Sequence, residues 1–304
     1  MSPVILVAGS ANLDFVVRAQ NIPAPGETVL GRDFQTFPGG KGANQAVACA
    51  RAGGVTTHML AAFGQDAFAA PIEASLREAQ VKVHCVLSDQ LPTGTAFICV
   101  SNTGENAITV APGANSELGP GHLPALDGFT HLLMQLEIPL DTVLAYAMQA
   151  KSAGLQVVLN AAPAQQLPPQ LLAAIDVLIV NEVELAQLSA PGQTVAQNLE
   201  SLVVPTVVVT LGAQGCCARH NGKLHFQSGL HIQPVDTTAA GDTFCGAFTA
   251  AMASGQAVEQ ALQFATAASA LACLKPGAQS SIPDRLEVET FMSQNPQPNH
   301  SQNP

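Results

Sequence analysis

One run of small residues ends in an acid and leads into an apolar segment of helical composition. The run consists of Ala239, Ala240, Gly241 and Asp242, and residues 243–248 follow it. Small residues let successive backbone N–H groups point into one concavity, and the start of a helix adds partial positive charge there. Such a pocket suits a phosphoryl group in transfer, and Asp242 at its mouth could orient or deprotonate an attacking hydroxyl. The alternative is a tight turn in which Asp242 only caps the helix.

A second glycine-rich turn combines close backbone approach with hydrogen-bond donors. It consists of Phe37, Pro38, Gly39, Gly40, Lys41, Gly42, Ala43 and Asn44. Its three glycines would let a polyol lie against the backbone, and the side chains of Lys41 and Asn44 could donate to hydroxyls. It is not a Walker A loop, because Lys41 precedes a glycine and not Ser or Thr. An ordinary strand-to-helix turn is the alternative.

Acidic and amide side chains follow two of the apolar runs that predict strands. Asn12 and Asp14 come just after the run at 4–8, where such a pair makes a natural fork for vicinal hydroxyls, unless it forms an Asx turn. Glu137 ends the run at 131–136 and could face either a ligand or water. These positions lie at the sheet edge where open α/β folds bind their ligands.

Two further segments that follow predicted strands fit a nucleotide. Asn181 and Glu184 are three residues apart on one helix face, where they could hold hydrated Mg²⁺ and a phosphate. A capping box fits the same two residues equally well. The second segment could cradle phosphates or turn a hairpin, and it consists of Thr210, Leu211, Gly212, Ala213, Gln214 and Gly215.

Short apolar runs alternate with longer Ala- and Leu-rich segments, and this rhythm predicts the elements that position those side chains. The expected strands are 4–8, 57–61, 131–136, 156–160, 177–180 and 206–210. The expected helices are 44–52, 67–80, 140–153, 182–188 and 195–202, with a mostly helical C-terminal third through 242–254, 257–274 and 284–292. Strand–helix alternation predicts a three-layer α/β/α fold around a mostly parallel sheet.

Two segments break the rhythm. Residues 13–37 and 94–110 show polar and apolar alternation with turn residues, which predicts a small antiparallel sheet standing off the main domain as a lid. We expect one domain over 1–292. The polar, proline-rich tail at 293–304 is expected to be disordered.

Composition limits the partners and the compartment. The 304 residues are 47% hydrophobic with a net charge of −11, which argues against a nucleic-acid surface but leaves room for a locally positive pocket. The 7 cysteines are odd in number and form no C-x-x-C, so neither disulfides nor a zinc site are expected. We find no signal peptide and no run long enough for a membrane helix, and we expect a cytoplasmic protein.

With these motifs in this order, the chain resembles the ribokinase family of carbohydrate kinases over residues 4–284. The matching runs are GSANLD (9–14), PGGKGANQAVA (38–48), NTGENAI (102–108), LLMQLE (132–137), NEVE (181–184), TLGAQG (210–215), DTTAAGDTF (236–244) and KPGAQSSIP (275–283). The resemblance implies ATP-dependent phosphorylation of the 5-hydroxyl of D-ribose. Chance matches to both glycine-rich runs are improbable.

The resemblance also implies a role for each matching residue. Asp242 would be the base, with the N–H groups of 239–242 as an anion hole. The sugar would be held by Asn12, Asp14, Gly39, Gly40, Lys41, Gly42, Ala43, Asn44 and Glu137. The ATP site would be lined by Asn181, Thr210, Leu211, Gly212, Ala213, Gln214, Gly215, Gly241 and Thr266, with Glu184 organising Mg²⁺.

A K⁺ site beside the anion-hole loop is implied as well, formed by Asp236, Thr238, Ala272, Lys275, Gly277 and Ser281.

Two positions depart from the family pattern. Thr266 replaces a more usual Asn or His near the adenine, and Lys275 stands where Arg is frequent but only a backbone carbonyl is required. The family's lid tends to make a homodimer contact, and the apolar positions Ala96, Ile98 and Val100 suit that role.

Two other functions remain open from the sequence. A kinase of the same frame could act on deoxyribose, another sugar or a nucleoside, although no Trp and a single Tyr leave little material for stacking a base. A non-catalytic sugar-binding protein would not need the anion-hole run. Sugar-dependent release of ADP from Mg·ATP separates the kinases from the binding protein.

Overall fold

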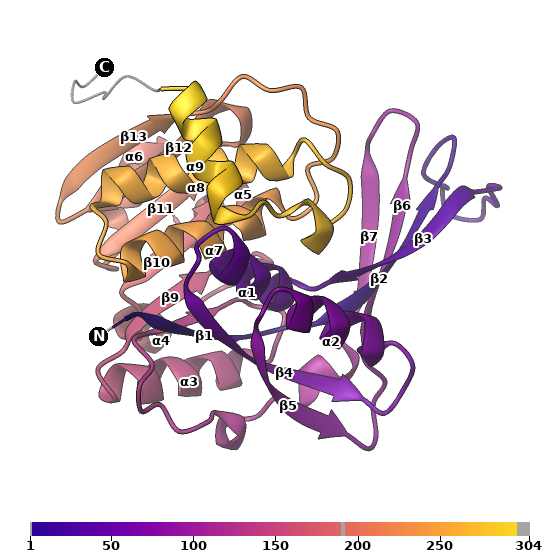
Figure 1. Ribbon diagram of the computed structural model, residues 1–304, viewed down its shortest axis with the longest axis horizontal. Helices are drawn as coiled ribbons and strands as arrows, with labels where there is room; N and C mark the ends of the chain where they lie inside the picture. Colours follow the sequence, from indigo (N-terminus) through magenta and orange to yellow (C-terminus); the bar gives the residue numbers. More distant parts are fainter. Residues whose placement is uncertain (1, 190–191, 297–304) are drawn as a thin grey trace.

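The computed structural model describes residues 2–189 and 192–296 and arranges them in three layers around one 9-stranded sheet (Figure 1). The strand order is β13-β12-β11-β10-β9-β8-β1-β4-β5, and every pair is parallel except β11–β12 and β12–β13. The strands are β1 (Val4–Ala8), β4 (Thr56–Gly64), β5 (Lys82–Ser88), β8 (His131–Met134), β9 (Gln156–Asn160), β10 (Val177–Asn181), β11 (Thr206–Thr210), β12 (Gly215–His220) and β13 (Lys223–Ser228).

Helices cover both faces of this sheet. One face packs against α1 (Lys41–Arg51), α2 (Ala69–Glu78), α7 (Ala240–Ala253), α8 (Val258–Ala272) and α9 (Arg285–Gln294). The other face packs against α3 (Leu140–Ser152), α4 (Pro169–Ala174), α5 (Glu182–Leu188) and α6 (Val195–Ser201). Along β1, Ile5 and Val7 face the first core while Leu6 and Ala8 face the second. This burial on both faces explains why the strands read as continuous apolar runs.

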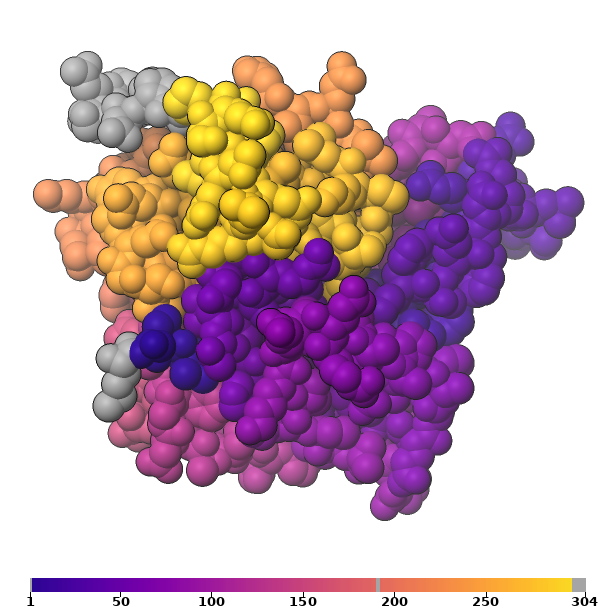
Figure 2. Space-filling model, in the orientation of Figure 1, coloured from indigo at the N-terminus to yellow at the C-terminus, as the bar shows by residue number. Residues whose placement is uncertain are grey.

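The lid is a separate 4-stranded sheet in the order β3-β2-β6-β7, and it extends from the main domain in Figures 1 and 2. Its strands are β2 (Asn12–Arg18), β3 (Arg32–Gly39), β6 (Gly94–Val100) and β7 (Asn106–Ala111). The expected lid is confirmed, but it is not antiparallel throughout, because β2 and β6 pair in parallel. Both strands leave the main domain in the same direction, and each then folds back through its own hairpin partner.

The expected strands and helices of the main domain are present, with ends that differ by a few residues. The expectation of a mostly helical C-terminal third needs correction, since the β12–β13 hairpin precedes α7. The edge strands β5 and β13 mix apolar residues with Lys, His and Gln, as edges often do, which hid them in the sequence.

Helix α9 runs to Gln294, and the tail expected at 293–304 lies mostly outside the described residues. Within the described part of the chain, no helix has the length and apolar character needed to cross a bilayer.

Candidate active site

Asp242 lies in the first turn of α7 with its carboxylate buried and held on both sides. Its Oδ2 accepts a hydrogen bond from Asn44 Nδ2 at 2.9 Å, and its Oδ1 accepts one from Gln45 Nε2 at 2.9 Å. Asn44 and Gln45 are consecutive residues of α1, so the packing of α1 against α7 fixes the orientation of the acid. The side chain of Asp242 is therefore bonded to α1, so the alternative in which Asp242 only caps its own helix does not account for its contacts.

The turn before Asp242 presents backbone N–H groups, although the N–H of Ala240, which the resemblance implied for the anion hole, is used inside the turn. Ala239 has φ +58° and ψ 10°, which reverses the chain just before the helix. Among the described residues, the N–H of Ala240 donates to Thr237 O at 3.2 Å, whereas the N–H groups of Gly241 and Asp242 have no hydrogen-bond acceptor. A Cβ added at Gly241 would meet nothing within 4 Å, so open space lies beside it. These two donors at a helix start suit an anion.

The sugar-binding residues predicted from the sequence converge beside this acid. Asn12 and Asp14 lie on β2, and Gly39, the register partner of Asn12, ends β3. A Cβ at Gly39 would come within 2.0 Å of Asp14 Oδ2, so only glycine fits there. Two buried acceptor oxygens, Asp14 Oδ1 and Asn44 Oδ1, have no hydrogen-bond partner among the described residues. Buried polar atoms are normally satisfied, so both oxygens call for donors from a ligand.

One lysine stands among several acids at this site. Burial alone would lower the pKa of Lys41, but Asp242, Glu137 and Glu184 raise it above its ordinary value. Burial, Glu137 and Asp242 together raise the pKa of Asp14 to about 7, although Lys41 acts in the opposite direction. Lys41 therefore stays protonated, and its charge acts on acids of both the predicted sugar site and the predicted nucleotide site.

Two residues that the sequence analysis did not single out, Ser10 and Asn115, help to anchor Glu137 and the start of β2. Its Oε2 accepts hydrogen bonds from Ser10 Oγ at 2.6 Å and from the N–H of Lys41 at 3.1 Å. Asn115 ties down the start of β2, since its Nδ2 donates to Asn12 Oδ1 at 2.8 Å and its Oδ1 accepts from the N–H of Ala11 at 3.0 Å. Ser10 lies within a recognisable motif, but Asn115 follows the lid in a segment with no distinguishing pattern.

The predicted nucleotide residues lie at the ends of neighbouring strands, where Asn181 of β10 is the register partner of Thr210 of β11. Asn181 and Glu184 do form the capping box, since Asn181 Oδ1 accepts from the N–H of Glu184 at 2.8 Å and Glu184 Oε2 accepts from the N–H of Asn181 at 2.7 Å. Burial raises the pKa of Glu184, against the opposing effects of the Asn181 hydrogen bond and of Lys41.

The segment at 210–215 forms the connection of the β11–β12 hairpin, through a 3₁₀ turn at Gly212–Gln214. Gly212 has φ +55° and its Cβ position is open, so a ligand can approach its backbone. Thr266 is buried in α8 with its Oγ1 3.6 Å from Cys216 Sγ, which shows its packing partner. No side-chain hydrogen bond joins Thr266 to Asp242 or to the capping box within the described ranges.

Three of the six residues predicted to hold the cation, Asp236, Thr238 and Gly277, are joined by hydrogen bonds just before α7. Asp236 Oδ1 accepts from the N–H and Oγ1 of Thr238 at 2.9 and 2.7 Å, and its Oδ2 accepts from the N–H of Gly277 at 3.0 Å. Burial raises the pKa of Asp236, but these hydrogen bonds outweigh it and leave the pKa below its usual value. The side chain of Lys275 is engaged by Glu287 at 2.8 Å. In residues 2–189 and 192–296, no three His, Cys, Asp or Glu side chains cluster as metal ligands.

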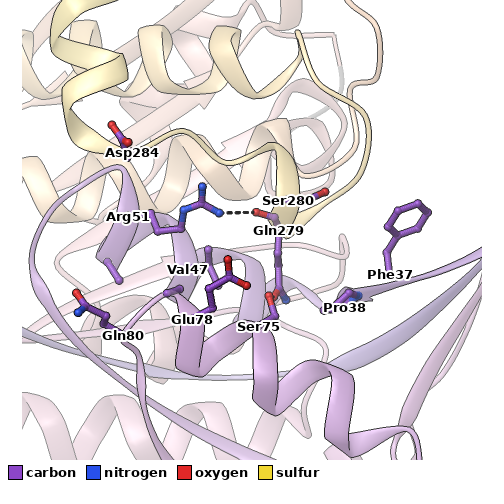
Figure 3. Close-up of a pocket in the computed structure, with 12 residues that line it drawn as sticks. Phe37, Pro38, Val47, Arg51, Ser75, Glu78, Gln80, Gln279, Ser280 and Asp284 are labelled. Carbon is purple, nitrogen blue, oxygen red and sulfur yellow. Dashed lines mark hydrogen bonds between the residues drawn. The ribbon is translucent and has the colours of Figure 1, made fainter.

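A separate cavity of about 590 Å³ lies between α1, α2 and the segment at 275–281, which carries part of the predicted cation site (Figure 3). Hydrogen bonds at this cavity join that segment to both helices. Arg51 at the end of α1 donates to the backbone oxygen of Gln279 at 3.3 Å, and Ser75 Oγ of α2 donates to Gln279 Oε1 at 2.6 Å. Through Gln279, the segment at 275–281 is tied to the helix that carries Lys41 and Asn44.

Comparison with known proteins agrees with this geometry. Residues 3–285 match the sequence model of the pfkB family carbohydrate kinase. The chain belongs to this family. It is 39% identical over 306 residues to Ribokinase of Haemophilus influenzae, covering 96% of this chain and 99% of the relative. The structure of Arabidopsis thaliana Ribokinase complexed with ribose and ATP superposes with a TM-score of 0.87 at 35% identity, over 96% of this chain and 99% of that chain. Deoxyribokinase of Salmonella typhi is 30% identical over 309 residues, with 96% and 99% coverage.

Proposed function

We propose that this chain transfers the terminal phosphoryl group of ATP to the 5-hydroxyl of D-ribose. The observation that carries the proposal is the pair of buried, unpartnered acceptors Asp14 Oδ1 and Asn44 Oδ1 beside the carboxylate of Asp242. Sugar hydroxyls supply the missing donors, and one more hydroxyl can then approach Asp242. Membership of a carbohydrate kinase family and the ribose and ATP bound by the plant relative support the choice of substrates.

In this mechanism, Asp242 orients the 5-hydroxyl and takes its proton. As the bond from O5 to phosphorus forms, the bond from phosphorus to the β-phosphate oxygen of ATP breaks, and the products are ribose 5-phosphate and ADP. The free N–H groups of Gly241 and Asp242 meet the negative charge on the transferred group. Oriented donors of this kind are worth about 3–4 kcal/mol each in other enzymes. Positioning and charge stabilisation supply most of the rate in phosphoryl transfer.

Residues around Asp242 would also hold the nucleotide and two kinds of cation. The charge of Lys41 interacts with Asp242, Glu137 and Glu184 and would act on the transferring phosphoryl group. The open backbone at Gly212 would admit the ATP phosphates, and Thr266 would line the adenine. Mg²⁺, when bound to ATP near Glu184, neutralises phosphate charge. K⁺ would sit among Asp236, Thr238 and the carbonyls of the 272–281 segment, where hard oxygen ligands suit it.

The lid has two proposed roles. It would exclude water from the site, because an open site would hydrolyse ATP. It would also make a homodimer contact, through apolar side chains such as Phe97, Ile108 and Val110, which are 54%, 54% and 40% exposed. Ala96 contributes little to that surface, since it is only 4% exposed. Light scattering should give a mass near twice the 31.2 kDa of one chain, and a monomeric mass would refute this contact.

The deciding assay measures ADP release from Mg·ATP and K⁺ with a panel of ribose, deoxyribose, fructose, adenosine and pseudouridine. We expect ribose to give the highest kcat/KM. Sites built to hydrogen-bond a hydroxyl reject analogues that lack it, so deoxyribose should be a poorer substrate. A preference for deoxyribose would favour the deoxyribokinase alternative, and ADP release with no sugar dependence would refute the proposal.

All 7 cysteines are free, which fits a reducing compartment and our proposal of a cytoplasmic enzyme.

A further inference from the structure

We propose that Gln45 is a positioning residue that aims the carboxylate of Asp242 at the sugar hydroxyl. This inference rests on the proposed function, since it assigns Asp242 the role of base. Gln45 is the residue after Asn44 on α1, and its side chain is fully buried. It binds Oδ1 of Asp242, the carboxylate oxygen that Asn44 does not bind.

Both N–H groups and the oxygen of the Gln45 amide are hydrogen-bonded to other side chains. Its Nε2 donates to Asp242 Oδ1 at 2.9 Å and to Asn160 Oδ1 at 3.0 Å. Its Oε1 accepts from Gln135 Nε2 at 2.7 Å. Asn160 is fixed in turn, because its Nδ2 donates to the backbone oxygen of Ile179 at 3.1 Å. A carboxylate can only accept, so this chain of amides has one consistent orientation.

The two amides on α1 therefore have different roles. Asn44 binds Asp242 Oδ2 and keeps its own Oδ1 free, whereas Gln45 binds Asp242 Oδ1 and has both N–H groups committed. Donors on both oxygens prevent the carboxylate from rotating. Asn160 is the last residue of β9 and Gln135 directly follows β8, so the edge of the central sheet holds Gln45 in place. Gln45 thus acts on the substrate only through Asp242.

The test compares three variants by steady-state kinetics with ribose. Gln45→Met keeps the length of the side chain but removes the donor, and Gln45→Glu keeps its shape and can donate only when the new carboxyl group is protonated. Asn198→Leu is the matched control, because Asn198 is a buried amide of α6 with no bond to this network. Melting temperature and ATP binding report on folding independently of turnover.

We expect Gln45→Met to lower kcat by about 10- to 100-fold, because a small misplacement of a catalytic group costs on this order. The KM for ribose should stay within about threefold, since its hydroxyl acceptors are untouched. Gln45→Glu should exceed Gln45→Met in kcat at pH 6 and lose that advantage by pH 9, as two adjacent carboxylates share one proton only at lower pH. Asn198→Leu should keep the wild-type kcat.

Three results would overturn the inference while leaving the proposed function intact. These are a wild-type kcat in Gln45→Met, equal changes in kcat and in KM for ribose, and an equal loss in Asn198→Leu. If Gln45→Met fails to fold, Gln45→Glu is compared with the wild type instead: its kcat relative to wild type should fall between pH 6 and pH 9, and a constant ratio would overturn the inference. Wild-type protein without sugar-dependent ADP release would instead overturn the proposed function, and this inference with it.

Discussion

Replacing Asp14 by Asn should stabilise the ligand-free protein and at the same time impair ribose phosphorylation. Asp14 is 7% exposed, and burial together with Glu137 and Asp242 raises its pKa from 3.8 to about 7. The folded protein therefore pays to ionise this carboxyl group, and that cost is the mark of a site arranged for a ligand. Asn has the same shape and carries no charge, so the substitution removes the cost.

The sign of the effect follows from proton binding. Between about pH 4 and pH 7 the folded state binds the proton of Asp14 more tightly than the unfolded state, so wild-type stability falls as the pH rises through this window. Above it the loss is complete, and the difference between the two pKa values corresponds to about 4 kcal/mol. Asn does not titrate, so the advantage of Asp14→Asn should grow across the window and level off above about pH 8.

Urea unfolding at pH 5, 6, 7 and 8 measures this difference directly. We expect a gain of about 2–4 kcal/mol for Asp14→Asn at pH 8 and a much smaller gain at pH 5. Asp127→Asn, at an exposed acid, is the control and should stay within about 0.5 kcal/mol of wild type. Loss of a charged acceptor should lower kcat/KM for ribose by about 10- to 100-fold. A gain that does not change with pH, or a loss of stability at pH 8, would refute the reasoning.

Three further predictions concern the anion-hole loop and its neighbours. Asp242→Asn should fold with a lowered melting temperature, because its amide nitrogen would face a donor of Asn44 or Gln45, and should lose at least about 100-fold in kcat. Near-normal turnover would show that another group acts as base. Rates in K⁺ should exceed those in Na⁺ at equal ionic strength, and indistinguishable rates would remove the site at Asp236 and Thr238. Ala239→Gly should change the unfolding free energy by less than about 1 kcal/mol, because glycine accepts the positive φ. Ala239→Val should lose about 2 kcal/mol, and equal stability of these two variants would contradict the strain argument.

Sequence periodicity predicted the core of the fold well, for a clear physical reason. Strands buried on both faces must be apolar throughout, and Val4–Ala8, Gln156–Asn160 and Thr206–Thr210 were each predicted with the bounds that the structure has. The edge strands Lys82–Ser88 and Lys223–Ser228 were not predicted, because partly exposed strands carry too many polar residues to stand out. The buried strand Gly215–His220 was missed as well, although a hairpin turn was one of the two alternatives for the segment at 210–215 that precedes it. The parallel pairing of β2 with β6 depends on how two hairpins lie together, which no local pattern records.

The sequence by itself determined which residues could do chemistry. Asp242 after a small-residue turn and Lys41 in a glycine-rich turn are local features, and their backbone geometry follows from the residue types around them. Only the tertiary structure decided how these residues meet. It placed Asn44 and Gln45 on the two oxygens of an acid almost 200 positions away, with separations of 198 and 197 residues. A hydrogen bond between distant segments depends on the packing of α1, α7 and the sheet, so a buried amide such as Gln45 has no mark in the sequence that distinguishes it from any other glutamine.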